Sequence, residues 1–404
     1  MLIGVPKETY PGERRVALVP LSLKPLVDAG HEVLVETGAG RAAGYHDEAY
    51  REKGARIAGG RRELFEQAKL LLQVRVCGAN PEGGQADLSL FRQDQTVIGL
   101  CHPFSSASAA QRLAGDRVTL FSLELIPRIT RAQSMDVLSS MSTISGYKAV
   151  LIAADTLPRM FPMMMTAAGT LTPARVFVVG AGVAGLQAIA TARKLGAVVS
   201  AYDVRPAVRE QVESLGAKFV ELELEAGDAE DKGGYAREMG EEFYRRQREM
   251  MLRVVAEHDV VITTAIVPGK KAPVLVTQEM LAGMAPGSVV VDMAAEQGGN
   301  CELTEAGRTV AHNEVFVVGP INLPSTVPYH ASQMYSRNMT AFVKHLSHEG
   351  TLRIDRDDEI TASTLVSHAG EVVHPRVREF LDLPPLAPPP GRIDEQTHQA
   401  AQGE

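Results

Sequence analysis

The segment RVFVVGAGVAG, residues 175–185, decides the fold of this chain. An apolar, strand-forming run leads into a GxGxxG pattern, and a helix-forming run, LQAIATARKLG, follows it. In such a unit the first glycine makes a tight turn, the second lets the backbone approach a diphosphate, and the third lets helix and strand pack closely. The N-terminus of the helix then faces the negative charge of the diphosphate. The turn residues that we expect to contact a dinucleotide are Gly180, Gly182, Val183, Ala184 and Gly185.

An acidic residue ends the next predicted strand, VVSAY, at 198–202. Asp203 comes 23 residues after Gly180, and a carboxylate at this position accepts hydrogen bonds from the adenosine ribose hydroxyls. It also repels a 2′-phosphate, so the pattern favours NAD(H) over NADP(H). Arg205 argues the other way, because an arginine nearby sometimes accommodates that phosphate. Asp203 carries more weight because it stands at the strand end itself, and we expect the nucleotide to contact Asp203, Val204 and Arg205.

Composition excludes several classes of protein. Hydrophobic residues make up 45% and charged residues 22% of the chain, as in soluble globular proteins. The net charge of −8 disfavours nucleic acid as a partner. Three cysteines without CxxC spacing, Cys77, Cys101 and Cys301, indicate a reducing compartment and predict no metal site. The N-terminus has no secretory pattern, and the apolar runs are shorter than the ~18 residues that span a bilayer, so we expect no membrane span.

The rest of the chain alternates strand-like and helix-like segments, which predicts an α/β fold. Strands are expected at LIGV, HEVLVE, LLLQVRV, TVIGLC and VTLFSLE in the first 125 residues, and at VVITTA, SVVVDM and VFVVGP later. The prediction is two Rossmann-like, doubly wound parallel-sheet domains linked by two long helices, near 132–156 and 329–347. The expected domains are residues 1–135 with 330–380, and the NAD(H)-binding residues 136–329. A flexible tail, 381–404, follows.

Four segments bear a resemblance to a known family. They are PRITRAQSMDVLSS (127–140), MFPMMMTAAGT (160–170), GGYAREMGEEF (233–243) and VDMAAEQGGNCELT (291–304). They resemble the NAD(H)-binding alpha component of proton-translocating NAD(P) transhydrogenase, of the alanine dehydrogenase/transhydrogenase family, and the resemblance runs from residue 1 to about 376.

The resemblance implies Si/Re-specific hydride transfer between NADH on this chain and NADP+ on a partner subunit, coupled to proton translocation. It also implies membrane-spanning and NADP(H)-binding partner subunits, a homodimer, and a cytoplasmic position on the inner face of the cell membrane, held through the partners.

By the same resemblance, Arg128, Gln133, Asp136 and Ser139 hold and orient the dihydronicotinamide. The last three are spaced three residues apart, so a helix would place them on one face. Gln133 offers a donor and an acceptor to a carboxamide, and Arg128 and Asp136 can brace each other. These four are the candidate catalytic residues.

Two further segments are expected at the nucleotide. The long polar stretch from Glu221 to Glu249 resembles a mobile loop that closes over NAD(H), with Gly234 and Tyr235 contacting it. Thr264 and Ala265 end the strand VVITTA, where small residues allow the nucleotide to approach the sheet edge.

The main alternative is an alanine dehydrogenase-like amino-acid oxidoreductase, which needs a carboxylate clamp and an acid–base group. Arg15 and His102 stand where that family keeps its substrate arginine and its histidine, although His102 in CHPF is also explained as a turn residue. Arg75 and Glu296, however, replace an expected lysine and aspartate. A saccharopine-type dehydrogenase is more distant, and a nucleotide sensor without chemistry is a third possibility. Direct hydride transfer between two nicotinamides needs no acid–base pair, and none stands near the glycine turn.

Overall fold

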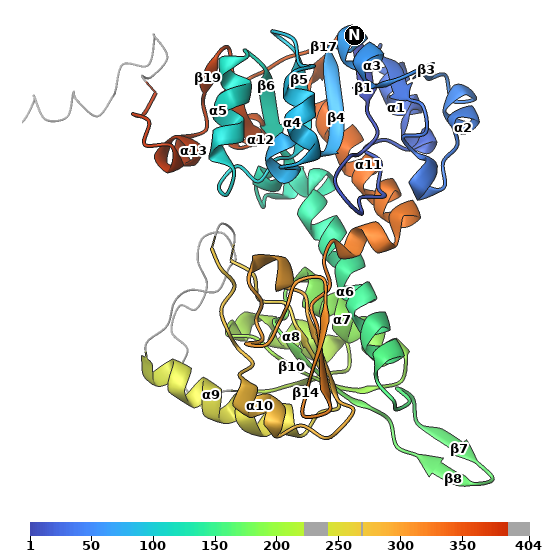
Figure 1. Ribbon diagram of the computed structural model, residues 1–404, viewed down its shortest axis with the longest axis vertical. Coiled ribbons are helices and arrows are strands. Elements are labelled where there is room, and N and C mark those ends of the chain that lie inside the picture. Colours follow the sequence, from blue (N-terminus) through green and yellow to red (C-terminus); the bar gives the residue numbers. More distant parts are fainter. Residues whose placement is uncertain (222–240, 268–269, 387–404) are drawn as a thin grey trace, which may run out of the picture.

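The computed structural model describes residues 1–221, 241–267 and 270–386, which form two α/β lobes (Figure 1). The eight-stranded sheet of the first lobe has the order β19-β18-β6-β5-β4-β1-β2-β3. β1 to β6 are parallel, whereas β18 and β19 run antiparallel at the edge. The strands are β1 (Leu2–Val5), β2 (Glu32–Glu36), β3 (Arg56–Ala58), β4 (Leu70–Arg75), β5 (Thr96–Leu100), β6 (Thr119–Ser122), β18 (Leu365–His368) and β19 (Glu371–Val372).

The second lobe holds a seven-stranded sheet of order β11-β10-β9-β12-β13-β15-β14, parallel except for β14. Its strands are β9 (Arg175–Val179), β10 (Val198–Tyr202), β11 (Lys218–Phe219), β12 (Val260–Thr263), β13 (Val289–Asp292), β14 (Thr309–His312) and β15 (Val315–Val318). A two-stranded hairpin, β7 (Met164–Thr166) with β8 (Gly169–Leu171), projects away from this lobe (Figure 1). The central strands are apolar and buried, as parallel sheets covered on both faces require.

Helices cover both sheets. Those of the first lobe are α1 (Lys24–Asp28), α2 (Asp47–Arg51), α3 (Arg61–Gln67), α4 (Gly83–Leu88), α5 (Ala107–Gly115), α12 (Glu359–Thr364) and α13 (Pro375–Phe380). Those of the second are α7 (Val183–Lys194), α8 (Arg209–Ser214), α9 (Glu241–Ala256) and α10 (Gln278–Ala282).

Both sheets reverse their strand order in the same way. The reversal lies between β1 and β4 in the first lobe and between β9 and β12 in the second. In doubly wound sheets, ligands bind at such reversals, outside the carboxyl ends of the strands. The start of β1 lies at the edge of the first lobe that is far from the second, so its carboxyl end points toward the second lobe (Figure 1). The predicted fold class is therefore confirmed.

Two long helices, α6 (Val137–Thr156) and α11 (Pro328–Leu346), stand where the chain passes between the lobes (Figure 1). α11 begins as the chain returns, and its buried apolar residues belong to the first-lobe core. The N-terminal half of α6 places Met141 and Ile144 in the first-lobe core, and its C-terminal half places Ala149 and Ala153 in the second-lobe core. One helix thus belongs to both cores. The domain limits drawn from the sequence stay a prediction.

The sequence predicts no segment apolar enough to span a bilayer, but α6 meets that criterion of length and hydropathy. Among the described residues it is the one helix long and apolar enough to cross a membrane, with a mean hydropathy of 1.3 over its most apolar stretch. Core helices of soluble proteins share this composition, and 39% of that stretch is buried within this structure. The finding is one of length and composition, and no membrane assignment follows from it.

Candidate nucleotide-binding site

The glycine turn after β9 has the geometry that its sequence predicts. Gly180 has a φ of +97°, and its N–H donates to the carbonyl of Tyr202 at 2.8 Å. A Cβ atom on Gly185 would lie 1.8 Å from the carbonyl oxygen of Gly180, so the helix start is pressed against the turn. A Cβ atom on Gly182 would meet nothing within 4 Å. The turn therefore leaves open space where a diphosphate would approach the N-terminus of α7, and a dinucleotide fits it.

Thr264, which follows β12, supports this turn. Its hydroxyl donates to the carbonyl of Gly180 at 3.0 Å and lies 3.3 Å from that of Val179. A Cβ atom on Gly180 would stand 2.5 Å from the Thr264 hydroxyl oxygen. Thr264 thus fixes the turn across the reversal of the sheet, and its contact with a nucleotide stays a prediction.

Ala265 is held by the side chain of Asn300, which no sequence pattern indicates as part of the site. Asn300, which is fully buried, accepts from the Ala265 N–H at 3.0 Å and donates to the Ala265 carbonyl at 2.8 Å. The backbone N–H of Asn300 is bound in turn by the Asp292 carboxylate at 2.7 Å. Both residues lie in VDMAAEQGGNC, one of the segments that carry the family resemblance, and they hold the end of β12 in place.

Asp203 stands where the sequence places it, but its carboxylate is already bound. Oδ2 accepts from the Ala181 N–H at 2.7 Å, which ties the acid to the glycine turn. The Arg205 side chain donates to both carboxylate oxygens at 2.9 Å. Asp203 as a whole is buried. The structure therefore pairs the two residues whose types favour different nucleotides, Asp203 for NAD(H) and Arg205 for NADP(H). Val204 lies between them and packs against the apolar core behind β9.

The segment expected at the nicotinamide is a bent connection and not one continuous helix. Gln133 lies in the 3-10 helix η5 (Thr130–Met135), and Asp136 has extended φ and ψ before α6 begins. The expectation that Gln133, Asp136 and Ser139 share one helix face is wrong. The reason is a helix cap: the Asp136 carboxylate accepts from the N–H of Ser139 at 2.9 Å and from its hydroxyl at 2.6 Å.

Neighbouring residues anchor this connection and leave Gln133 exposed. Asn338 on α11 donates to the Ser134 carbonyl at 2.8 Å, and Arg131 pairs with Asp358 at 2.7 Å. The side chains of Arg128 and Gln133 are exposed. Gly146 of α6 then lies so close to α7 that a Cβ atom there would stand 2.1 Å from the Ala184 carbonyl. The glycine turn and the 127–140 segment are therefore joined through two helices in close contact.

Comparison with known proteins agrees with this geometry. Residues 4–145 match the family model for the N-terminal domain of alanine dehydrogenase/PNT, and residues 149–375 match that for its C-terminal domain. The chain belongs to the alanine dehydrogenase/PNT family.

Within this family the chain is more similar to transhydrogenases. It is 47% identical to the first part of the NAD(P) transhydrogenase alpha subunit of Rhodospirillum rubrum, over 93% of this chain and 98% of that protein. It is 42% identical in sequence to the transhydrogenase from Sinorhizobium meliloti, whose crystal structure matches 93% of this chain and 100% of that one with a TM-score of 0.81. The alanine dehydrogenase of Mycolicibacterium smegmatis is 29% identical over 95% of this chain and 97% of that protein.

Two of the residues expected of an alanine dehydrogenase pocket, Arg15 and Arg75, lie together near the reversal of the first sheet. Arg15 donates to both carboxylate oxygens of buried Glu13, at 2.7 and 2.6 Å, and Arg75 donates to Glu13 at 3.1 Å. Although burial raises it, the pKa of Glu13 is held well below its usual range by Arg15 and Arg75. Both guanidinium groups are therefore engaged on an internal carboxylate. The sequence pattern indicates the two arginines but not Glu13, although GERR places it two residues before Arg15.

Asn322 connects this cluster to the second lobe. Its side chain lies 3.3 Å from Arg15 and 3.2 Å from Glu13, and its backbone N–H donates to Glu296 at 3.1 Å. Arg15, Arg75 and Glu296 thus belong to one network. His102 does not join it: His102 has a φ of +48° in the turn after β5, and its imidazole has no hydrogen bond to any residue in the described ranges.

Other predicted features lie elsewhere. Gly234, Tyr235 and residues 387–404 of the expected tail are outside the described residues. The expected loop does not extend to Glu249, because helix α9 already begins at Glu241. Among residues 1–221, 241–267 and 270–386, no three His, Cys, Asp or Glu side chains gather as metal ligands would.

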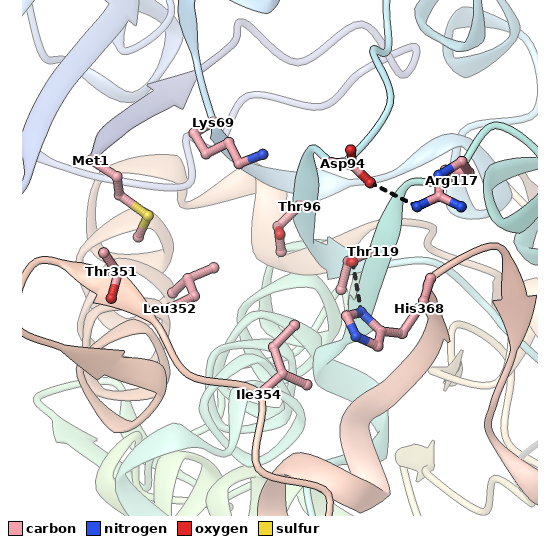
Figure 2. Close-up of a pocket in the computed structure, with 11 residues that line it drawn as sticks. Met1, Lys69, Asp94, Thr96, Arg117, Thr119, Thr351, Leu352, Ile354 and His368 are labelled. Atoms are coloured by element: carbon pink, nitrogen blue, oxygen red, sulfur yellow. Dashed lines mark hydrogen bonds and ion pairs between the residues drawn. The ribbon is translucent and has the colours of Figure 1, made fainter.

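A separate cavity of about 330 Å³ lies in the first lobe (Figure 2). Lys69, Thr96 and Thr119 line it, and they stand at the amino ends of β4, β5 and β6. His368 and Thr119 form a hydrogen bond of 3.0 Å across its wall, and Arg117 pairs with Asp94 at 3.4 Å (Figure 2). The cavity therefore lies at the amino ends of these strands, whereas a ligand at the strand reversal would lie at their carboxyl ends. It does not belong to the nucleotide site.

Proposed function

We propose that this chain is the NAD(H)-binding alpha subunit of a proton-translocating NAD(P) transhydrogenase. The observation that carries the proposal is the open glycine turn with Asp203 beside it, in a chain 47% identical to a transhydrogenase alpha subunit. The chain has one GxGxxG turn, so the second nucleotide, NADP(H), is assigned to a partner subunit. Hydride transfer of the Si/Re-specific type, between NADH on this chain and NADP+ on the partner, belongs to the same proposal.

Different residues of this chain would bind different parts of NAD(H). The N-terminus of α7 and the open space at Gly182 would take the diphosphate, and Asp203 would take the adenosine ribose. Val183, Ala184, Val204, Arg205, Thr264 and Ala265 would line the same end of the sheet. Bound NADH would supply the hydride from its nicotinamide ring.

Gln133 and Arg128 would orient that ring, since both side chains are exposed on an anchored connection. Asp136 and Ser139 act on the ring through the cap that fixes where α6 begins. Catalysis then rests on holding two rings in reacting geometry and on excluding water, with no proton donor required.

Coupling to proton translocation requires partner subunits that span the membrane. We infer that the chain sits on the cytoplasmic face of the cell membrane through them. The proposed homodimer is supported by the projecting β7–β8 hairpin, where Met163 and Met165 are 60% and 77% exposed. Exposed apolar groups on a projecting hairpin favour contact between copies. Light scattering should report a dimer for the wild type and a monomer for Met163→Ser/Met165→Ser, and a dimeric variant would show that the hairpin does not hold the copies together.

The function is tested by purification and assay. The chain should be recovered from membranes with its partner subunits in mild detergent. In that complex, oxidation of one nicotinamide nucleotide should reduce an acetylpyridine or thio analogue of the other. Oxidation of NADH by the isolated chain with pyruvate and ammonia would favour the alanine dehydrogenase alternative instead. The engagement of Arg15 and Arg75 by Glu13 argues against that alternative, because a substrate carboxylate would meet a clamp already occupied. A chain that binds nucleotide but has neither activity would be a sensor.

A further inference from the structure

Arg205 occupies the acceptor atoms that an adenosine ribose needs. Asp203 Oδ1 accepts from the backbone N–H and from Nε–H of Arg205, both at 2.9 Å. Oδ2 accepts from the Ala181 N–H at 2.7 Å and from Nη2–H of Arg205 at 2.9 Å. An ionised carboxylate offers about four acceptor positions. All four are filled from within the chain.

The four bonds differ in how readily they can be given up. Those from Ala181 and from the backbone of Arg205 belong to the turns after β9 and β10, and they fix the carboxylate in place. The other two come from a side chain at the edge of the site, where the side chain of Arg205 is 16% exposed and that of Asp203 is 6% exposed. A ribose presents two hydroxyls, and the guanidinium covers one position on each oxygen.

We propose that Arg205 is a specificity-determining residue that holds the ribose position closed, and that NAD(H) binds by exchanging its ribose hydroxyls for the guanidinium on Asp203. The inference rests on the proposed function, because it requires NAD(H) to be the ligand. A ligand that offers two neutral hydroxyls to Asp203 can complete the exchange, whereas one with a phosphate at the 2′ position offers the carboxylate no donor there. Because the Asp203–Arg205 pair must open before the ribose binds, it favours a ligand with a ribose diol over one with a 2′-phosphate.

The pair also sets the apparent affinity. A site that is open for a fraction of the time binds with its affinity reduced by that fraction. If Arg205 leaves Asp203 about a tenth of the time, removal of the side chain should tighten NADH binding about tenfold.

The test is calorimetric titration of Arg205→Met and Arg205→Gln with NADH, ADP-ribose and reduced nicotinamide mononucleotide. Both variants should bind NADH and ADP-ribose about tenfold more tightly than the wild type. The mononucleotide, which lacks the adenosine ribose, should bind equally to all. Arg209→Met is the matched control, because Arg209 lies four residues away and pairs with Glu221 at 2.8 Å; it should leave all three affinities unchanged.

A double-mutant comparison separates action through Asp203 from a direct contact. In an Asp203→Ala background, Arg205→Met should no longer tighten NADH binding. Unchanged or weaker NADH binding by both Arg205 variants, in protein that keeps the wild-type melting temperature, would overturn the inference while leaving the proposed function standing. A wild-type chain that bound no NADH would overturn both.

Discussion

Gly185 is packed against Gly180 so closely that a Cβ atom on Gly185 would lie 1.8 Å from the carbonyl oxygen of Gly180. Gly182, between them in sequence, has nothing within 4 Å of the same position. The two glycines therefore serve different ends. Gly185 is required by the fold, and Gly182 leaves room for a ligand.

This difference predicts that substitution by alanine mainly lowers stability at Gly185 and mainly weakens NADH binding at Gly182. Gly185→Ala should lower the free energy of unfolding by about 3 kcal/mol, because the turn and α7 must move apart. Gly182→Ala should change it by less than about 1 kcal/mol, since φ at Gly182 suits alanine. The Gly182 variant should nevertheless bind NADH at least about tenfold more weakly, because a methyl group would enter the space for the diphosphate. Urea unfolding and NADH titration of both variants test this, and a Gly182→Ala protein with wild-type NADH affinity would contradict it.

Asp203 should decide nucleotide choice. Loss of its carboxylate in Asp203→Ala should weaken NADH binding by about 1.5–3 kcal/mol, because charge-assisted hydrogen bonds to the ribose disappear. Titration with NADH and NADPH measures both the loss and the preference, with Asp94→Ala in the first lobe as a control. Wild-type protein that prefers NADPH, or a variant with unchanged NADH affinity, would refute the assignment.

Many helices and strands can be predicted from short stretches of the sequence alone. LIGV corresponds to β1 residue for residue, and the predicted helix at 329–347 differs from α11 by one residue at each end. Buried central strands are predictable because they are continuous apolar runs. The sequence pattern does not predict β18, because this short strand pairs with β6, which is distant in sequence. It does not predict β14 either, because this short edge strand has no buried residue to give it an apolar pattern. α6 begins later than expected because the Asp136 cap stops the helix from extending to Ala132.

The site was only partly predictable, for a similar reason. The glycine turn and Asp203 follow a spacing that is typical of dinucleotide-binding units, so both can be predicted from the sequence. The pairing of Asp203 with Arg205 depends on a side-chain rotamer, and the grip of Asn300 on Ala265 joins residues 35 apart in sequence. Such contacts have no periodicity or spacing that a single sequence reveals.

Asp292 should be a major contributor to stability. Its fully buried carboxylate accepts five hydrogen bonds, which come from Thr263, Ala294, Asn300, Cys301 and Thr304. Asp292→Asn would turn an amide donor toward some of these donors, so the free energy of unfolding should fall by about 3 kcal/mol. Chemical denaturation measures the loss. The same change at the exposed Asp94, which pairs with Arg117, should cost less than about 0.5 kcal/mol, and equal effects at both positions would contradict this account.

His374 should make the protein sensitive to acid. Burial, with Arg376 nearby, lowers the pKa of His374 from 6.5 to about 4, and its Nδ1 is buried without a hydrogen-bond partner among the described residues. Between these two values the unfolded chain binds a proton that the folded chain does not, so stability falls as the pH falls. From pH 7 to pH 5 the wild type should lose up to about 2 kcal/mol through this group. His374→Gln should remove that share of the loss, whereas the same change at exposed His348 should not. Identical pH profiles for wild type and His374→Gln would exclude the effect.

Gln133 should matter for the rate of hydride transfer more than for binding. It is exposed on η5, between Ser134, which Asn338 anchors, and Arg131, which Asp358 anchors. Most of the affinity should come from the glycine turn and Asp203, at the other end of the nucleotide. Gln133→Asn keeps the amide but shortens its reach, and a shift of about 1 Å between reacting carbons can cost on the order of a hundredfold in rate.

The variant should therefore bind NADH within about tenfold of the wild-type affinity, while single-turnover hydride transfer falls by on the order of a hundredfold. Stopped-flow measurement needs the complex reconstituted with the proposed NADP(H)-binding partner, because the proposed function places the second ring there. Gln67→Asn, on α3 of the first lobe, makes the same chemical change far from the site and should transfer hydride normally. If Gln133→Asn also transfers hydride at the wild-type rate, Gln133 does not touch the reacting ring. The 127–140 segment would then hold the end of α6 without orienting the nicotinamide, and the cap between Asp136 and Ser139 would be its main role.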